Sequence, residues 1–410
     1  MKKRSMTLIL ALAVCLGAGA NLMAQSTRLE STEGGGVWLG PLNVSPFLTV
    51  SALYDSNVDF AREGELAEGD REEEKTGGYT LQPGFDLLLP GNGWQLDGRA
   101  YLQVEEYSKD FAESREDWYE TLNWYGETER GTGLRLSQMM QQVVHDDTDW
   151  ADRWNDRREM RFAAQLGKPV SDKTKLGLSG YYHDLKYDDE ELFDSDRVGG
   201  TLTIAAKLSD KTDGLLVGGY ASHSSEDQEG NAESLTAHAG FASRLTDKTS
   251  YRTTVGVEHY SGFGDDESEV GLSYDLGATW RASERVTLGL SGRSTYEPAE
   301  DVGQNSMLVS TLGLVLNYRP LTRWALTVGG AYRREDYTRE IELNQMQPTT
   351  VAAGGRERTD DQLSGHAQLV YGVNRYASIF VGGNYTYTTS SIEEFDYKRW
   401  RANAGLALRY

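Results

Sequence analysis

Cysteine, long apolar runs and basic charge are all scarce in this sequence. Its one cysteine, Cys15, falls in an N-terminal segment that has the form of a secretory signal peptide. The mature chain is therefore expected to have no disulfide scaffold and no thiol chemistry. After that segment, no apolar run approaches the roughly 18 residues that a transmembrane helix needs. With 41 Lys and Arg against 63 Asp and Glu, the net charge of −22 excludes a simple electrostatic nucleic-acid binder.

The N-terminal segment divides the chain into three expected parts. Three basic residues precede an apolar stretch, Leu8–Leu16. Cleavage is expected after Ala24, with Ala20 as the alternative, so residues 1–24 are interpreted as a signal peptide. Residues 25–41 are polar and Gly-rich and are expected to form a flexible lead-in. Residues 42–410 contain no Pro- or Ser-rich linker and are expected to form one folded domain.

The clearest alternation of apolar and polar residues is at the C-terminus. From Trp400 to Tyr410 every second residue is apolar, which predicts a strand with one apolar and one polar face. The strand runs to the last residue and ends on an aromatic side chain. This ending resembles the C-terminal signal of bacterial outer-membrane β-barrels, which implies recognition by a barrel-assembly machinery. We interpret Trp400, Leu406, Leu408 and Tyr410 as that assembly signal.

Similar alternation recurs along the chain and predicts eighteen strands. The predicted strands centre on Leu48–Tyr54, Tyr79–Leu89, Trp94–Glu105, Trp118–Gly126, Leu134–Val144, Met160–Leu166, Leu176–Tyr182, Val198–Leu208, Leu215–Ala221, Leu235–Leu245, Tyr251–His259, Val270–Trp280, Val286–Tyr296, Leu308–Tyr318, Trp324–Tyr332, Leu363–Val373, Ala377–Tyr387 and Trp400–Tyr410. Glu120 and Gln138 interrupt the apolar faces of two of these strands. An even number of strands brings both ends of the domain to the same side of a membrane.

The connections between the predicted strands alternate in length. A short turn of the Ser-Asp-Lys-Thr type recurs at residues 171–174, 209–212 and 246–249, whereas the intervening connections are longer and acidic. On the apolar faces, Trp and Tyr gather at the strand ends. They are Trp94, Tyr251, Trp280, Tyr318, Trp324 and Tyr410 at one end, and Tyr54, Tyr182, Tyr296, Tyr332, Tyr385 and Trp400 at the other. Both patterns are typical of transmembrane barrels.

These patterns together predict the fold class. We expect an all-β protein: a closed, antiparallel, up-and-down transmembrane β-barrel of about 18 strands, with short periplasmic turns and longer acidic extracellular loops. Its expected location is the bacterial outer membrane, in contact with lipid and lipopolysaccharide.

A short motif in the first predicted strand carries a family resemblance. Pro46 introduces this strand, which ends in the run Tyr54-Asp55-Ser56-Asn57. The motif resembles the putative β-barrel porin type 2 family. That resemblance implies the same barrel architecture over the whole mature chain. Because relatives of that family accompany exopolysaccharide systems, it also implies an exit channel for a secreted exopolysaccharide, with periplasmic polysaccharide-export components as partners.

Side chains opposite the apolar faces would line the lumen of such a barrel, and basic ones predominate. The basic candidates are Arg99, Arg135, Arg161, Lys175, Arg197, Arg252, Arg293, Arg333, Arg399 and Arg401, and the acidic candidates are Asp97, Glu105, Glu258 and Asp275. Barrels of roughly 16 to 18 strands enclose an aqueous channel, and charged rings tune its selectivity. We therefore expect a porin-like channel that passes small hydrophilic solutes by diffusion and favours anions. The alternative is that these arginines pair with carboxylates across strands and only keep the interior polar.

A third interpretation is a barrel-embedded hydrolase. His145 and His183 each stand beside an Asp near an outer strand end, and a His with a nearby carboxylate can activate water. Six His among so many carboxylates produce such neighbours by chance, so we do not expect an enzyme. The sequence contains no Gly-rich phosphate loop and no Cys/His metal spacing, so neither a cofactor nor a metal is expected. The pattern indicates neither the oligomeric state nor the solute.

Overall fold

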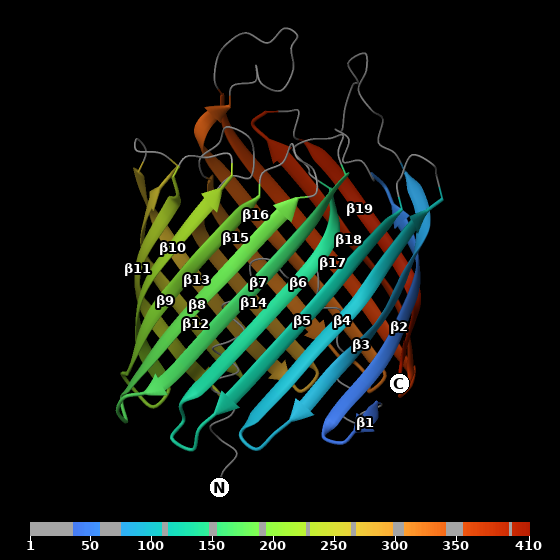
Figure 1. Cartoon of the computed structure of the whole chain (residues 1–410), viewed down its shortest axis with the longest axis horizontal. Helices are drawn as coiled ribbons and strands as arrows, with labels where there is room; N and C mark the ends of the chain where they lie inside the picture. The colour runs from blue at the N-terminus through green and yellow to red at the C-terminus, as the bar shows by residue number, and fades with distance from the viewer. Residues whose placement is uncertain are drawn as a thin grey trace.

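The structure is a computed structural model that describes residues 36–57, 75–108, 114–146, 154–187, 194–226, 230–263, 268–297, 307–341, 356–392 and 396–410. Within these residues, eighteen strands form one closed antiparallel sheet (Figure 1). The predicted fold class, an all-β closed antiparallel barrel, is therefore confirmed. Among the described residues, no helix has the length and apolar character needed to cross a bilayer.

The barrel strands follow one another around the sheet in chain order. They are β2 (Leu42–Asp55), β3 (Thr76–Pro90), β4 (Trp94–Tyr107), β5 (Arg115–Glu127), β6 (Gly133–Asp146), β7 (Trp154–Pro169), β8 (Thr174–Tyr187), β9 (Ser195–Lys207), β10 (Thr212–Ser225), β11 (Ala232–Thr246), β12 (Thr249–Ser261), β13 (Ser268–Ser283), β14 (Val286–Glu297), β15 (Met307–Tyr318), β16 (Trp324–Ile341), β17 (Arg356–Asn374), β18 (Ala377–Ser390) and β19 (Tyr397–Arg409). Each of the eighteen predicted segments overlaps one of these strands.

Some expected segments lie outside the described residues. They are the expected signal peptide, residues 1–24, and most of the long connections that were expected to be extracellular loops. The last residues of the expected lead-in form a short strand, β1 (Val37–Leu39), which pairs with the start of β2.

Large apolar side chains cover the outside of the barrel because alternate residues of each strand face outward. Val270 and Leu272, for example, are 68% and 65% exposed. Trp94 and Trp280 are also exposed, near the end of the barrel that carries the short turns. This exterior is the one that a barrel presents to lipid.

Tyr296 departs from the predicted aromatic pattern. It was expected on the outer face, but it is 5% exposed and stacks on Tyr260 with ring centroids 5.5 Å apart. The pairing of β14 with β13 ends at Ser294, and the Tyr296 N–H donates instead to the Glu258 carboxylate (3.2 Å). The predicted outward position of Tyr296 is therefore wrong: its pairing with β13 stops two residues earlier, although its pairing with β15 continues, and its ring packs on Tyr260.

The repeated turn motif links neighbouring hairpins at the short-turn end. The first hydroxyl of a turn accepts a bond from the backbone N–H two residues later, as Ser209 does from Lys211 and Thr246 from Lys248. The Nζ groups of Lys211 and Lys248 then donate to backbone carbonyls at the start of the next turn, at 3.3 and 3.2 Å. The recurrence of Lys in this motif thus has a structural reason.

The junction between β19 and β2 is held by the motif that ends β2. The Asp55 carboxylate is fully buried and accepts bonds from Arg399 Nε (3.0 Å) and Nη2 (2.6 Å). Such a two-pronged, charge-assisted pairing is strong and fixes geometry. Arg401 Nε lies 3.2 Å from the same carboxylate. Two guanidinium groups of the last strand therefore converge on one carboxylate of the first barrel strand.

The residues on either side of Asp55 extend this junction. Ser56 N–H donates to the Trp400 carbonyl (3.0 Å), and Trp400 N–H donates to Ser56 Oγ (2.9 Å). Asn57 Nδ2 donates to the Lys398 carbonyl (3.0 Å). Tyr54 stacks on Trp400 with ring centroids 4.6 Å apart. Every residue of the Tyr-Asp-Ser-Asn run thus contacts β19. The first and last barrel strands are therefore paired, and the sheet exposes no open edge to lipid.

Replacing Asp55 by Ala should destabilise the barrel, because Arg399 and Arg401 would lose their shared counter-charge in a buried site. Removing one partner of a buried pair costs about 3–5 kcal/mol, so we expect a lower free energy of unfolding in urea and an earlier loss of the folded band when samples are heated before electrophoresis. Asp210→Ala, which removes the exposed partner of Lys207, is the control and should leave unfolding unchanged. An Asp55→Ala barrel as stable as this control would contradict the role given to the junction.

The four residues of the expected assembly signal lie on the outer face of the closing strand. Trp400, Leu406, Leu408 and Tyr410 are 44%, 39%, 40% and 59% exposed. Tyr410 N–H donates to the Pro46 carbonyl (3.0 Å), and the Tyr410 ring stacks with Tyr376 at 6.1 Å. Their role in assembly stays a prediction.

Deleting Tyr410 should reduce the amount of barrel assembled in the outer membrane without changing transport by the barrels that do form. The measurement is the heat-modifiable folded band in membrane fractions. Tyr376→Ala, which removes the ring stack but keeps the terminal aromatic, separates loss of packing from loss of the signal and should assemble normally. Normal assembly of the Tyr410 deletion would count against the signal.

Candidate functional site in the barrel lumen

Charged side chains of the junction wall, which we define as β19 and β2–β5, pair with one another inside the lumen. Asp86 on β3 accepts bonds from Arg99 Nε and Arg409 Nη2, both at 2.7 Å. The Arg99 guanidinium also lies over the Phe47 ring, 4.8 Å from its centroid. Arg99, which was expected to line the pore, therefore faces the lumen as a member of an ion pair.

A second group of pairs lies on the same wall, next to the Asp55 junction. Glu105 on β4 accepts bonds from Arg401 Nη2 (2.8 Å) and from Arg115 Nε (3.0 Å). Because Arg401 also contacts Asp55, a continuous chain of charges connects β2, β19, β4 and β5. The expected pore residues Arg399, Arg401 and Glu105 thus neutralise one another or their neighbours.

Other expected lumen residues also have partners. Asp97 accepts from Asn123 (3.2 Å), and Glu258, which is 1% exposed, accepts from Thr295 (3.2 Å). Arg161 pairs with Glu159, and Arg333 pairs with Glu335. These side chains are bonded and keep the interior polar, but not through arginine–carboxylate pairs across strands: each of these two ion pairs lies within one strand, and the carboxylates of Asp97 and Glu258 accept from neutral side chains.

Five expected basic residues differ from the rest. Within the described part of the chain, they make no hydrogen bond and no ion pair, and we call them the unpaired set: Arg135 on β6, Lys175 on β8, Arg197 on β9, Arg252 on β12 and Arg293 on β14. Arg293 is exposed inside the lumen and lies opposite Asp275 in the register of β14 with β13. The lumen therefore has a wall whose charges are bonded to one another and a stretch of basic side chains that, among the described residues, are not hydrogen-bonded, with the Asp275 carboxylate facing Arg252 and Arg293.

Of the two histidines in the hydrolase interpretation, only His183 is described with its side chain, and it contacts a carboxylate other than the one expected. His183 Nε2 lies 2.8 Å from Glu159, whose carboxylate also pairs with Arg161 and accepts a bond from Gln141. Asp184, the sequence neighbour of His183, faces the other side of β8, because successive residues of a strand alternate. The His145 side chain lies outside the described residues. No group of three metal-ligating side chains occurs in the described ranges.

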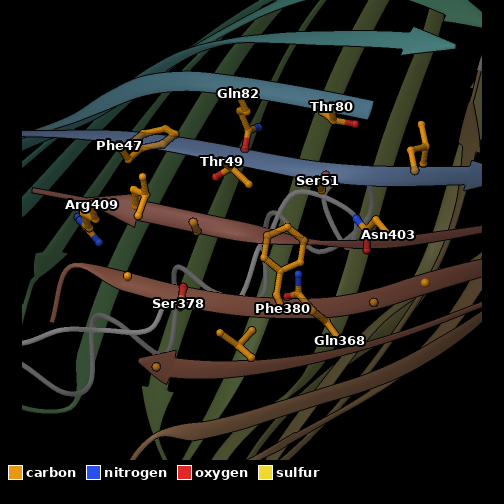
Figure 2. Close-up of a pocket in the computed structure, with 18 of the residues that line it drawn as sticks. Phe47, Thr49, Ser51, Thr80, Gln82, Gln368, Ser378, Phe380, Asn403 and Arg409 are labelled. Carbon is orange, nitrogen blue, oxygen red and sulfur yellow. The ribbon is translucent and has the colours of Figure 1, made fainter. Parts of the chain in front are cut away.

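A cavity of about 720 Å³ lies against the lumen side of the junction wall, extending onto β17 and β18. Amide and hydroxyl side chains line it, among them Gln82, Gln368 and Asn403, together with the aromatic rings of Phe47 and Phe380. Figure 2 shows Phe380 and Gln368 beside one another, and Phe47 on β2 and Gln82 on β3 across the intervening strand β19. These neutral residues were not predicted to be functional, since only charged lumen positions were selected. Their positions on the polar faces of the predicted strands could have identified them as lumen residues.

A comparison with family models bears on the C-terminal third of the chain. Residues 267–410 match the family described as Putative beta-barrel porin 2. The family resemblance is confirmed over that stretch, which contains β13 to β19. Among curated proteins, no match to the chain is found.

The chain is also similar to several solved structures. The chain is similar to the siderophore receptor PirA from Pseudomonas aeruginosa, at 8% identity and a TM-score of 0.46, over 90% of this chain and 80% of that one. It is also similar to the FrpB iron transporter from Neisseria meningitidis, at 10% identity and a TM-score of 0.48, over 89% of this chain and 82% of that one. Similarity at this level says nothing about what the present chain transports.

The family match and the closed barrel with its apolar exterior place the protein in the bacterial outer membrane. The surfaces that contact solutes in such a barrel are those of the lumen, so the unpaired set and the junction-wall cavity are the candidate functional site.

Serine substitutions should separate the unpaired set from the paired arginines. Replacing Arg252 and Arg293 together by Ser should shift the reversal potential in a salt gradient toward cations, because two lumen charges without a bonded partner are lost. Arg99→Ser, matched in chemistry, should mainly reduce stability, since it breaks the Asp86 pair. An unchanged reversal potential in the Arg252/Arg293 double variant would show that these two arginines, like Arg99, have a structural role and do not set ion selectivity.

Proposed function

We propose that the protein is a passive channel through which small hydrophilic solutes diffuse across the outer membrane, with a preference for anions. The unpaired set carries this proposal. Within the described residues, five basic side chains without a bonded partner face the lumen, whereas the arginines of the junction wall are bonded to carboxylates. Asp275 is the carboxylate that faces two of the five, Arg252 and Arg293. Fixed positive charge along an aqueous pore raises the local concentration of anions and lowers that of cations.

Export of an exopolysaccharide is the second candidate, and the junction-wall cavity favours it. The side-chain amides of Gln82, Gln368 and Asn403 can exchange hydrogen bonds with sugar hydroxyls. The rings of Phe47 and Phe380 supply apolar surfaces beside these groups. An exit channel of this kind would work with periplasmic polysaccharide-export components.

We do not propose catalysis. His183 faces the lumen while Asp184 faces outward, so the pair that suggested a hydrolase does not converge. Glu159, the carboxylate that does contact His183, is already engaged by Arg161.

Conductance in a planar bilayer tests the proposed function. Purified barrel should give discrete current steps, and in a salt gradient the reversal potential should indicate anion preference. Absence of steps from folded, heat-modifiable protein would contradict passive diffusion. Adding an anionic oligosaccharide distinguishes the two candidates: reversible blockage of the current supports polymer passage, whereas an unaffected current supports a channel for small solutes only.

A further inference from the structure

Two polar residues interrupt the outer, lipid-facing surface of β5 and β6. Glu120 is paired in register with Ala100 and Met140, and Gln138 with Leu122 and Phe162. Those neighbours belong to the apolar outer face, so Glu120 and Gln138 face outward too. Both side chains are partly exposed.

The strand register places Glu120 near the middle of the membrane. One row of directly paired outer residues crosses β2 to β8: Pro46, Phe85, Ala100, Glu120, Met140, Met160 and Asp184. Because barrel strands are tilted by roughly 40°, such a row climbs across the membrane. It starts beside Tyr410 at the periplasmic end and passes beyond Tyr182, an aromatic of the extracellular border. Glu120 is the central member of the row.

Neither polar group has a partner within the described part of this chain. No hydrogen bond or ion pair there involves Glu120 or Gln138. A polar side chain facing lipid at this depth is unfavourable, and intramembrane polar groups are normally satisfied by one another or by another segment. The arrangement therefore calls for a partner that approaches from the membrane.

The surface next to Gln138 is shaped to receive such a partner. An external groove of about 420 Å³ is lined by Gln138, Leu122, Trp124, Phe162, Ala164 and Gly180. Ala164 and Gly180 are small, whereas Trp124 and Phe162 are large, so the groove lies between bulky side chains where the wall is thin. Small residues of this kind let membrane-embedded surfaces approach closely.

We propose that this face, Glu120 and Gln138 with the adjoining groove, is the contact through which two copies of this chain associate in the membrane. The patch is self-complementary: it holds an acceptor, the Glu120 carboxyl group, beside a donor, the Gln138 amide. In a two-fold contact each patch meets its own copy, so Gln138 of one copy donates to Glu120 of the other, and the reverse bond also forms. Trp124 of each copy then packs into the groove of the other.

Cysteine cross-linking in native membranes tests this contact. The chain's one cysteine, Cys15, lies in the expected signal peptide, so single cysteines can be introduced into an otherwise thiol-free barrel. Leu122→Cys should give a covalent dimer with a flexible bismaleimide. The control is Leu314→Cys on β15, which is 49% exposed on the outer face and away from the patch. No dimer from Leu122→Cys, or equal dimer from both variants, would overturn the proposal.

Polar-to-apolar substitutions test the hydrogen bonds themselves. The Glu120→Leu and Gln138→Leu double variant should lower the dimer-to-monomer ratio in mild detergent by about tenfold, the effect of losing two weak intramembrane bonds. Glu120→Gln keeps an acceptor and should retain most of the dimer, and the heat-modifiable band verifies folding of each variant. Ala164→Trp fills the groove and should also abolish the dimer. An unchanged dimer-to-monomer ratio in the double variant would contradict the proposal. So would a monomeric wild-type protein that retains bound lipopolysaccharide, if Ala164→Trp displaces that lipid.

Discussion

The barrel closes where the carboxylate of Asp55, on the first barrel strand, meets Arg399 and Arg401 on the last. A buried charge is costly unless it is paired and hydrogen-bonded, and here the carboxylate accepts a two-pronged bond at 2.6 and 3.0 Å. Sliding β19 by one residue would turn both arginines toward lipid and leave Asp55 buried without a counter-charge. This pair therefore selects one register for the joint that completes the sheet.

The same constraint shapes the lumen. Arg401 contacts both Asp55 and Glu105, and Arg409 and Arg99 both donate to Asp86. These charged side chains of the junction wall are therefore paired with one another and link β19, β2, β3 and β4. What remains on that wall for a solute is a neutral surface of amides, hydroxyls and aromatic rings. Net positive charge is left to strands farther from the joint. The division of the lumen into a neutral wall and a basic stretch thus follows from where the barrel has to close.

The strands could be predicted from the sequence because alternation is a local signal, and a barrel makes it recur in every strand. The partners of the charges could not. Asp55 and Arg399 are 344 positions apart, and only the closure of the sheet brings them together. Alternation placed Arg99 in the lumen correctly but could not distinguish it from Arg293. Each lies opposite a carboxylate in register, Asp86 and Asp275, but within the described residues only Arg99 is hydrogen-bonded to it. Tyr296 was misplaced because the backbone N–H of Tyr296 donates to the Glu258 side chain after the pairing of β14 with β13 has ended, which a local pattern cannot show.

A cysteine pair across the joint tests the central claim most directly. Thr49 and Ala407 face each other in the register of β2 with β19. Between these two strands the hydrogen-bonded pairs are those of even-numbered residues, as the bonds at Ser56–Trp400 and Pro46–Tyr410 show. The odd-numbered, lumen-facing pair Thr49–Ala407 is therefore of the non-hydrogen-bonded type, in which the side chains are closer. Thr49→Cys with Ala407→Cys should oxidise to an intramolecular disulfide in folded barrels, whereas Ser51→Cys with Ala407→Cys, a pair that is two residues out of register, should not. Efficient oxidation of the second pair and none of the first would show that the strands join in another register and that Asp55 does not set the joint.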